Sequence, residues 1–191
     1  MAKMSVDREL SRAERELARA KAGVARLRRR LPKTVVQDYR LAGPGGRPVK
    51  LSALFGRHRD LILVHNMGRT CPYCTMWADG FNGVLKHLES RAAFVVVSPD
   101  PPATQARFAR SRSWKFRMVS SRGTSLPEDL GFRTTEGRYR PGVSILRKDR
   151  GRIVRVSRVG FGPWDDFCSV YNLFGLLPDG ADDWRPRFTY R

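Results

Sequence analysis

The chain has 191 residues, of which 41% are hydrophobic, and its 37 Lys and Arg residues against 18 Asp and Glu give a net charge of +19. This length and apolar fraction allow one domain with a substantial core and exclude wholesale disorder. No apolar run approaches the ~20 residues that span a bilayer, and the charged first residues lack a secretory leader, so we expect a cytoplasmic protein with no membrane partner.

The positive charge favours weak, salt-sensitive attraction to acidic partners. Arginines are spread along the chain and cluster tightly only in RLRRR at 26–30. No folded nucleic-acid-binding motif accompanies them. We therefore expect no sequence-specific binding of nucleic acid.

The first segment, residues 5–31, is predicted to be a helix that Ser5 caps and Pro32 ends. Apolar residues recur along it at alternating spacings of three and four, the period of a coiled coil: Leu10, Ala13, Leu17, Ala20, Val24, Leu27 and Leu31. We expect this seam to pack on the protein's own body, and the alternative is that two copies pair through it as a homodimer. The predicted domains are an N-terminal helix over 1–33, packing on the body or on a partner, and a body over 34–191.

Strands and helices alternate after a turn-rich connector at 41–50. Buried strands are predicted at 61–64 and 94–97, a shorter strand at 116–121, and a hairpin of 142–146 with 152–159 that turns near Gly151. The predicted helices are 72–89, 102–112 and 163–175. This order predicts an α/β protein with a thioredoxin-like fold and an N-terminal helical extension.

Two of the three cysteines, Cys71 and Cys74, lie just beyond the predicted strand 61–64, at the start of a helix whose first turn suits Pro72. The helix N-terminus lowers the pKa of a thiol placed there, and Arg69 is expected to add to this effect. Cys74, one turn further on, is expected to be more buried. The spacing therefore predicts a dithiol–disulfide oxidoreductase in which Cys71 attacks and Cys74 resolves, with a thiol or disulfide of a protein or small molecule as substrate.

A metal site is the first alternative, since cytosolic cysteine pairs also bind zinc. It would need Cys168 and one of His58, His65 or His87 to converge on the pair, because the chain has no second pair of cysteines. His65, directly after a strand, is expected to be a core histidine. We therefore expect no metal and no cofactor; a non-catalytic interaction module also stays open.

A thiol peroxidase is another alternative, because the stretch GRPVKLSALFGRHRDLILVHN resembles the start of the peroxiredoxin fold. Peroxiredoxins place a threonine three residues before the peroxidatic cysteine. Here the residue three positions before Cys71 is Gly68, and the residue three positions before Cys74 is Cys71. The nearby Thr70 lies directly before Cys71 and so does not match the peroxiredoxin spacing. Peroxidase activity is therefore the weaker expectation. The quartet CPYC also matches the glutaredoxin motif.

Several stretches together resemble one family from end to end. They occur in this order: RRRLP, DYRLAGPGGRPVKLSALFGRHRDLILVHNM, CPYCTMWADGFNGVLKHL, VVVSPDPP, SWKFRMVSS, LPEDLGF, PGVSILRKDRGRIVRVS and VYNLFGLLPDGADDW. The chain resembles the bacterial domain-of-unknown-function family eight-nine-nine, whose members are described as thioredoxin-like dithiol–disulfide oxidoreductases. The resemblance implies a thioredoxin-like fold and a redox role, without an established substrate.

Two further residues are candidates for the site. Thioredoxin-like proteins place a cis-proline facing the cysteines, and the resemblance assigns that role to Pro141; the alternative is an ordinary proline at the start of a strand. Asp79 is a candidate proton relay for Cys74, or alternatively an acidic residue that suits the helix dipole. Trp77 is expected in the core, and Cys168 as an inert buried thiol within a helix.

Overall fold

The computed structural model describes the backbone of residues 2–190 and the side chains of residues 5–190. Six α-helices occur in this part of the chain: α1 (Ala2–Arg30), α2 (Pro72–Gly83), α3 (Leu85–Arg91), α4 (Pro102–Ser111), α5 (Leu126–Asp129) and α6 (Ser169–Phe174). The strands are β1 (Thr34–Val36), β2 (Arg40–Ala42), β3 (Pro48–Lys50), β4 (Asp60–His65), β5 (Ala93–Ser98), β6 (Arg117–Ser120), β7 (Gly142–Asp149) and β8 (Arg152–Gly160). Two 3-10 helices, η1 (Pro44–Gly46) and η2 (Leu51–Phe55), complete the order.

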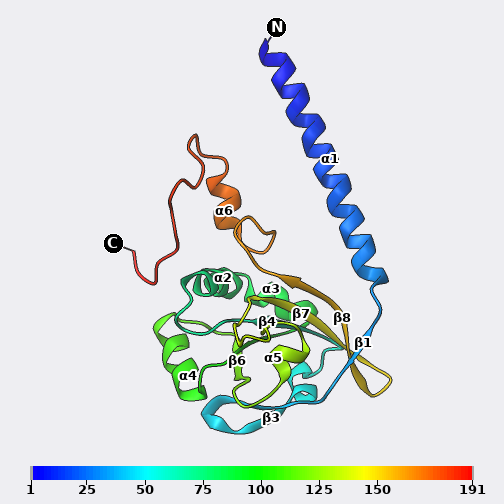
Figure 1. Cartoon of the computed structure of the whole chain (residues 1–191), viewed down its shortest axis with the longest axis vertical. Helices are drawn as coiled ribbons and strands as arrows, with labels where there is room; N and C mark the ends of the chain where they lie inside the picture. The colour runs from blue at the N-terminus through cyan, green and yellow to red at the C-terminus, as the bar shows by residue number, and fades with distance from the viewer. Residues whose placement is uncertain (1, 191) are drawn as a thin grey trace.

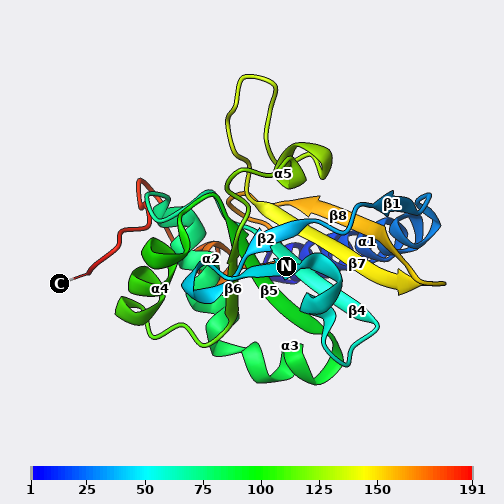
Figure 2. The ribbon, with the colours of Figure 1, turned by 90° about the horizontal axis from the view of Figure 1, so that it is seen from below.

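The strands of residues 2–190 form one mixed sheet in the order β1-β8-β7-β4-β5-β6-β2-β3. Figure 2 shows β1, β8 and β7 side by side in this sheet. β4 is parallel to β5 and β5 to β6, as expected for strands joined through helices. β7 joins the other side of β4 in the antiparallel sense and forms a hairpin with β8. This arrangement confirms the α/β, thioredoxin-like class, with the buried strand β4 at the centre.

The sheet carries an apolar core on each face. Leu61 and Leu63 of β4 belong to the core that η2 and α5 cover, whereas Val64 belongs to the core with Ala78 of α2 and Leu85 of α3. Successive side chains of a strand point to opposite faces, so the continuous apolar run of β4 fills both cores. Helix α2, which begins with the cysteine pair, is thereby held against one face of the sheet.

The prediction of one continuous helix over 72–89 is wrong, because the structure has two helices, α2 and α3, in this range. The chain leaves the helical conformation at Val84, where φ is −106° and ψ is 10°, and α3 begins at the next residue. Val84, at the break, is 47% exposed. Gly83 directly before the break suits a helix end.

The final helix is shorter than the predicted 163–175, since α6 covers only Ser169–Phe174. Trp164 adopts a left-handed φ of 69°. The Asp165 carboxylate accepts hydrogen bonds from the backbone N–H groups of Gly162, Phe167 and Cys168 at 2.8–3.1 Å. A side chain that satisfies three backbone donors offers the segment an alternative to a helix. Cys168 therefore lies at the start of α6 and not within a helix.

The turn between β7 and β8 agrees with the sequence prediction, whereas the connector 41–50 differs from it in part. The hairpin of β7 and β8 turns at Arg150 and Gly151, both with left-handed φ values, which confirms the predicted turn. The connector 41–50 is more ordered than predicted. It forms the hairpin of β2 and β3, with Gly45 and Gly46 at positive φ in the turn.

Helix α1 projects away from the body, which it joins at its C-terminal end (Figure 1). It begins before Ser5, so Ser5 is not its cap; its hydroxyl donates to Glu9 one turn on. The large apolar side chains of the predicted seam are 45–61% exposed. The structure thus leaves the seam uncovered.

Within residues 2–190, no helix has the length and apolar character needed to span a membrane.

Candidate functional site

The thiol pair sits at the junction between β4 and α2. Cys71 is the N-cap residue of α2, and its Sγ accepts a hydrogen bond from the backbone N–H of Cys74 at 3.0 Å. Pro72 follows at the first helical position, where a missing N–H leaves no partner unsatisfied. The Thr75 hydroxyl donates to the Cys71 carbonyl at 3.1 Å. The helix start therefore presents an amide donor directly to the Cys71 sulfur.

The environment separates the pKa values of the two thiols. The pKa of Cys71 is lowered to about 7, first by the hydrogen bond from the Cys74 thiol and also by the backbone N–H groups of Cys74 and Tyr73, against an opposing effect of burial. The pKa of Cys74 is raised, because its thiol donates to Cys71 and because it is buried. Cys71 is 8% exposed and Cys74 is 3% exposed. The less deeply buried cysteine is thus also the one favoured as thiolate.

Alkylation of reduced protein should therefore show a midpoint near pH 7 for Cys71. In the Cys74→Ala variant, the midpoint should move toward 9.0, the ordinary value, because the thiol donor is lost. Backbone donors remain, so the shift should be partial. Iodoacetamide rates measured from about pH 5 to about pH 10 in a Cys168→Ser background test this. An unchanged midpoint would contradict the role of the Cys74 thiol.

Hydrogen bonds of Asn66 and Asp100 hold the loop between β4 and Cys71 in place. The Asn66 Oδ1 accepts from the Gly68 backbone N–H at 2.8 Å, and its Nδ2 donates to the Cys74 carbonyl at 3.5 Å. The Asp100 carboxylate, after β5, accepts from the Arg69 backbone N–H at 2.7 Å. Neither Asn66 nor Asp100 was predicted as a site residue, although polar residues within two positions of the end of a buried strand are a signal for both. The hydrogen bonds that lower the pKa of Cys71 come from Tyr73 and Cys74 and not from Arg69.

Gly68 occupies the position three residues before Cys71, and its backbone explains the glycine. Its φ is +110°, and a Cβ atom there would lie 3.1 Å from the Asp100 Oδ2. Any other side chain would be strained at that φ and crowd a carboxylate. The loop thus has no room for a threonine at this position.

Pro141 corrects one expectation. It precedes β7, whose first residue Gly142 pairs with His65, so it lies at the sheet edge where β4 ends. All peptide bonds of the described residues are trans, so the expected cis-proline is absent. The Pro141 carbonyl accepts from the Phe161 backbone N–H at 3.0 Å and extends the pairing of β7 with β8. In the structure, Pro141 is thus a trans-proline at the start of a strand.

The side chain of Asp79 contacts two residues that follow α4. It forms an ion pair with the Arg112 guanidinium and accepts from the Trp114 indole N–H at 2.7 Å. Both partners follow α4, so Asp79 links α2 to the segment after α4. No hydrogen bond to Cys74 is among its contacts in the described part of the chain.

Asp79→Asn should therefore reduce stability by about 1.5–3 kcal/mol, the usual value of hydrogen bonds to a charged group. It should leave the rate of thiol–disulfide exchange unchanged. Urea unfolding and reaction with oxidised glutathione measure the two effects. The matched control is Asp166→Asn, which removes an ion pair of two exposed side chains and should change stability by less than about 1 kcal/mol. Loss of exchange in Asp79→Asn without loss of stability would support the proton relay instead.

The geometry of the thiol pair fits the family that the sequence indicates. Residues 4–189 match the family described as "Bacterial protein of unknown function (DUF899)". The chain belongs to this family. Among the curated proteins, none matches the chain.

Solved structures similar to this DUF899 chain include peroxiredoxins. Peroxidoxin BcpB from Mycobacterium tuberculosis is 25% identical, with a TM-score of 0.57 over 67% of this chain and 84% of that one. A cysteine-to-serine mutant of PrxQ from Xylella fastidiosa is 17% identical, with a TM-score of 0.56 over 67% and 84%. Reduced Prx3 from Vibrio vulnificus, in complex with hydrogen peroxide, is 14% identical, with a TM-score of 0.56 over 71% and 90%. All three neighbours show a thioredoxin-type fold. The likeness to peroxidoxin BcpB also supports a thiol redox function in broad terms.

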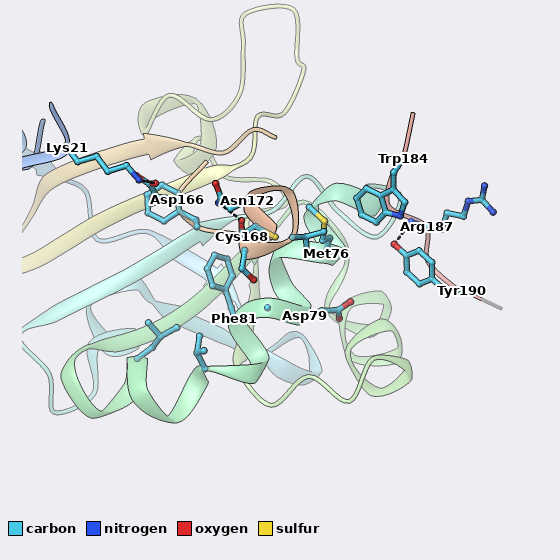
Figure 3. A pocket seen from close by; sticks show the side chains of 16 residues that line it. Lys21, Met76, Asp79, Phe81, Asp166, Cys168, Asn172, Trp184, Arg187 and Tyr190 are labelled. Atoms are coloured by element: carbon cyan, nitrogen blue, oxygen red, sulfur yellow. Dashed lines mark hydrogen bonds and ion pairs between the residues drawn. The ribbon is translucent and has the colours of Figure 1, made fainter. Parts of the chain in front are cut away.

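A cavity of about 870 Å³ lies between α2 and the C-terminal segment of the DUF899 chain (Figure 3). Met76, Asp79, Cys168 and Trp184 are among its lining residues, whereas Cys71 and Cys74 are not. It therefore belongs to the packing of the C-terminal segment on α2 and is not a cleft above the thiols. Cys168 is half-buried at its wall, and burial raises its pKa.

The described residues of the DUF899 chain contain no group of three His, Cys, Asp or Glu side chains that could hold a metal ion. His65, a candidate ligand, is buried; its ring stacks on Phe132 at 3.8 Å, and its Nε2 lies 3.0 Å from the Ser144 hydroxyl. This confirms it as a core histidine. Cys168 lies in the wall of the α2 cavity, which neither thiol of the pair lines.

Proposed function

We propose that this DUF899 protein is a thiol–disulfide oxidoreductase whose reactive group is the Cys71–Cys74 pair. The observation that carries the proposal is the Cys71 sulfur at the start of α2, with a backbone N–H of the helix donating to it at 3.0 Å and a pKa lowered to about 7. About half of such a thiol is thiolate at neutral pH, and the thiolate is the nucleophile of disulfide exchange.

The reaction uses both thiols in turn. The Cys71 thiolate attacks one sulfur of a substrate disulfide, so a Cys71–substrate bond forms and the other substrate sulfur leaves as a thiolate that takes a proton from water. Cys74 then loses its proton and attacks the Cys71 sulfur, which releases the second substrate thiolate. The substrate gains two electrons, and the protein is left with a Cys71–Cys74 disulfide. A thiol donor reverses these steps to restore the pair.

The proposed substrates are disulfides of proteins or small molecules. Arg69 and Thr70, directly before Cys71, are exposed, so a substrate can approach the pair from this loop. We place the reaction in the cytoplasm, where cysteine pairs are more often catalytic than structural. Asp79 bonds to Arg112 and Trp114, and the Pro141 carbonyl extends the pairing of β7 with β8. We therefore assign the chemistry to the two cysteines alone.

Thiol peroxidase is the second candidate, and the 25% identity to peroxidoxin BcpB is the observation that favours it. In that reaction Cys71 would attack a peroxide oxygen to give a sulfenic acid, with water or an alcohol leaving, and Cys74 would then form the disulfide and release water. The glycine at position 68 weighs against it, because glycine carries no hydroxyl at the position where peroxiredoxins have a threonine, and a Cβ there would crowd the Asp100 carboxylate.

One set of measurements distinguishes the candidates. Reduced protein is titrated against mixtures of reduced and oxidised dithiothreitol, with metal content measured in the same sample. The proposal expects a two-electron transition that Cys71→Ser and Cys74→Ser abolish and Cys168→Ser retains. Stopped-flow oxidation by oxidised glutathione should be faster than by hydrogen peroxide. Faster peroxide oxidation would favour the peroxidase, one zinc per chain lost in Cys71→Ser would favour the metal site, and a pair that does not exchange would favour an interaction module.

A further inference from the structure

Helix α1 carries an apolar seam that its own body leaves uncovered. Apolar residues recur at spacings of three and four from its first turn to the residue after its end, and their large side chains are 45–62% exposed: Val6, Leu10, Leu17, Val24, Leu27 and Leu31. The body meets α1 on a different side, where Lys21 forms an ion pair with Asp166 at 2.5 Å and Ala25, one turn on, is half-buried. A seam that keeps the heptad period over more than three heptads is typical of a two-stranded coiled coil.

Charges flank the seam in an asymmetric way. In heptad terms, Leu10, Leu17, Val24 and Leu31 take the a positions, and Val6, Ala13, Ala20 and Leu27 the d positions. The adjacent e and g positions are acidic in the first half of the helix, with Asp7, Glu9, Glu14 and Glu16. In the second half they hold Lys21, Gly23, Arg28 and Arg30. Each half therefore complements the other half and repels itself.

We propose that α1 pairs with α1 of a second copy as an antiparallel two-stranded coiled coil. The alternation of large and small seam residues selects the register. Leu10 packs on the partner's Leu27, and Val6 on the partner's Leu31. In the middle, Ala13 packs on the partner's Val24, and Leu17 on the partner's Ala20. Each small side chain thus faces a larger one, which keeps the seam filled.

The same register pairs opposite charges along both edges. Asp7 lies beside the partner's Arg28, and Glu9 beside the partner's Arg30. Glu14 lies beside the partner's Lys21, a residue that also contacts Asp166 of its own body. In the described residues, α1 carries no charged side chain buried under the body that would prevent this approach.

Other arrangements fail on the same residues. A parallel pair places Glu9 beside the partner's Glu14 and sets Ala13 and Ala20 against their own copies, which leaves gaps in the seam. An antiparallel shift by one heptad in one direction sets Glu14 and Glu16 against their own copies. The shift in the other direction sets Lys21 against its own copy. Either shift also leaves two large apolar residues outside the pairing.

The first test is the molar mass of the full chain in solution by sedimentation equilibrium. Wild type should be a dimer at micromolar concentration, and Leu17→Asp, which places a carboxylate in the central layers of the seam, should be a monomer. Arg15→Asp, on the opposite side of the helix, is the matched control and should remain a dimer. The redox transition of the cysteine pair should be unchanged in Leu17→Asp, which shows that the body is folded. A monomeric wild type, or a dimeric Leu17→Asp, would overturn the proposal.

Direction is tested by cross-linking in a background with all three native cysteines replaced by serine. A mixture of Leu10→Cys and Leu27→Cys chains should form a disulfide-linked dimer under mild oxidation, and neither variant alone should do so. Cross-linking of Leu10→Cys with itself would indicate parallel helices and overturn the antiparallel register. Glu14→Lys alone should weaken the dimer, and the double variant with Lys21→Glu should restore it, because the pair is then reversed in sign.

Discussion

Cys74→Ser is expected to accumulate a stable mixed disulfide through Cys71, whereas Cys71→Ser is expected to accumulate none. The first half-reaction needs only the Cys71 thiolate, which the helix start and its lowered pKa supply. The second half-reaction needs the Cys74 sulfur, so its removal stops the exchange after one step. Non-reducing gels and mass spectrometry after reaction with oxidised glutathione or a protein disulfide measure the trapped species.

The effect should be close to all-or-none, because Cys74 has a raised pKa and lies more deeply buried than Cys71. Both variants are made in a Cys168→Ser background, so that the third thiol gives no mixed disulfide of its own. The Cys168→Ser protein alone should cycle normally. Equal trapping by the two variants would contradict the assigned roles, and trapping through Cys74 alone would reverse them.

The second large effect concerns the stability of the protein at mildly acidic pH. His65 is fully buried between Phe132 and Ser144, and burial, with a smaller effect of Arg155, lowers its pKa to about 3. In the unfolded chain its pKa returns to about 6.5. The unfolded state therefore binds a proton between these values that the folded state does not, and stability falls as pH falls through this range.

The expected slope is up to about 1.4 kcal/mol per pH unit below about pH 6. Urea unfolding at about pH 7, 6 and 5 measures it, and this range lies above the pKa of Asp60, which its ion pair with Arg147 lowers further. His65→Gln should be less stable than wild type at neutral pH but should show a shallower slope. An equal slope in both proteins would mean that other groups cause the acid sensitivity.

The position of the thiol pair was accessible to sequence analysis because its signals are local. A continuous apolar run, LILV, predicts a strand buried on both faces, and a proline directly after Cys71 predicts a helix start. Together these place a cysteine at a helix N-terminus without knowledge of any distant residue. The turn at Gly151 was equally local, since a left-handed turn needs a particular residue type at one position.

The contacts of side chains with partners far away in the sequence could not be predicted in this way. Asp79 belongs to the same helix as the thiols, but its direction depends on Arg112 and Trp114, which lie 33 and 35 residues further on. The hydrogen bond that holds the backbone N–H of Arg69, before Cys71, needs Asp100 from beyond the end of the neighbouring strand β5. Only the parallel pairing of β4 with β5 brings these two strand ends together.

The sequence by itself determined the α/β class, the N-terminal helix with its heptad seam, and a cysteine pair at a strand-to-helix junction. These features follow from periodicity and from conformational preferences that extend over a few residues. The tertiary structure decided which groups complete the site and which surfaces stay uncovered. Asp165 satisfies three backbone donors and replaces the first turns of the expected last helix, and the body leaves the seam of α1 exposed. Both outcomes depend on competition between partners that only the folded chain brings within contact distance.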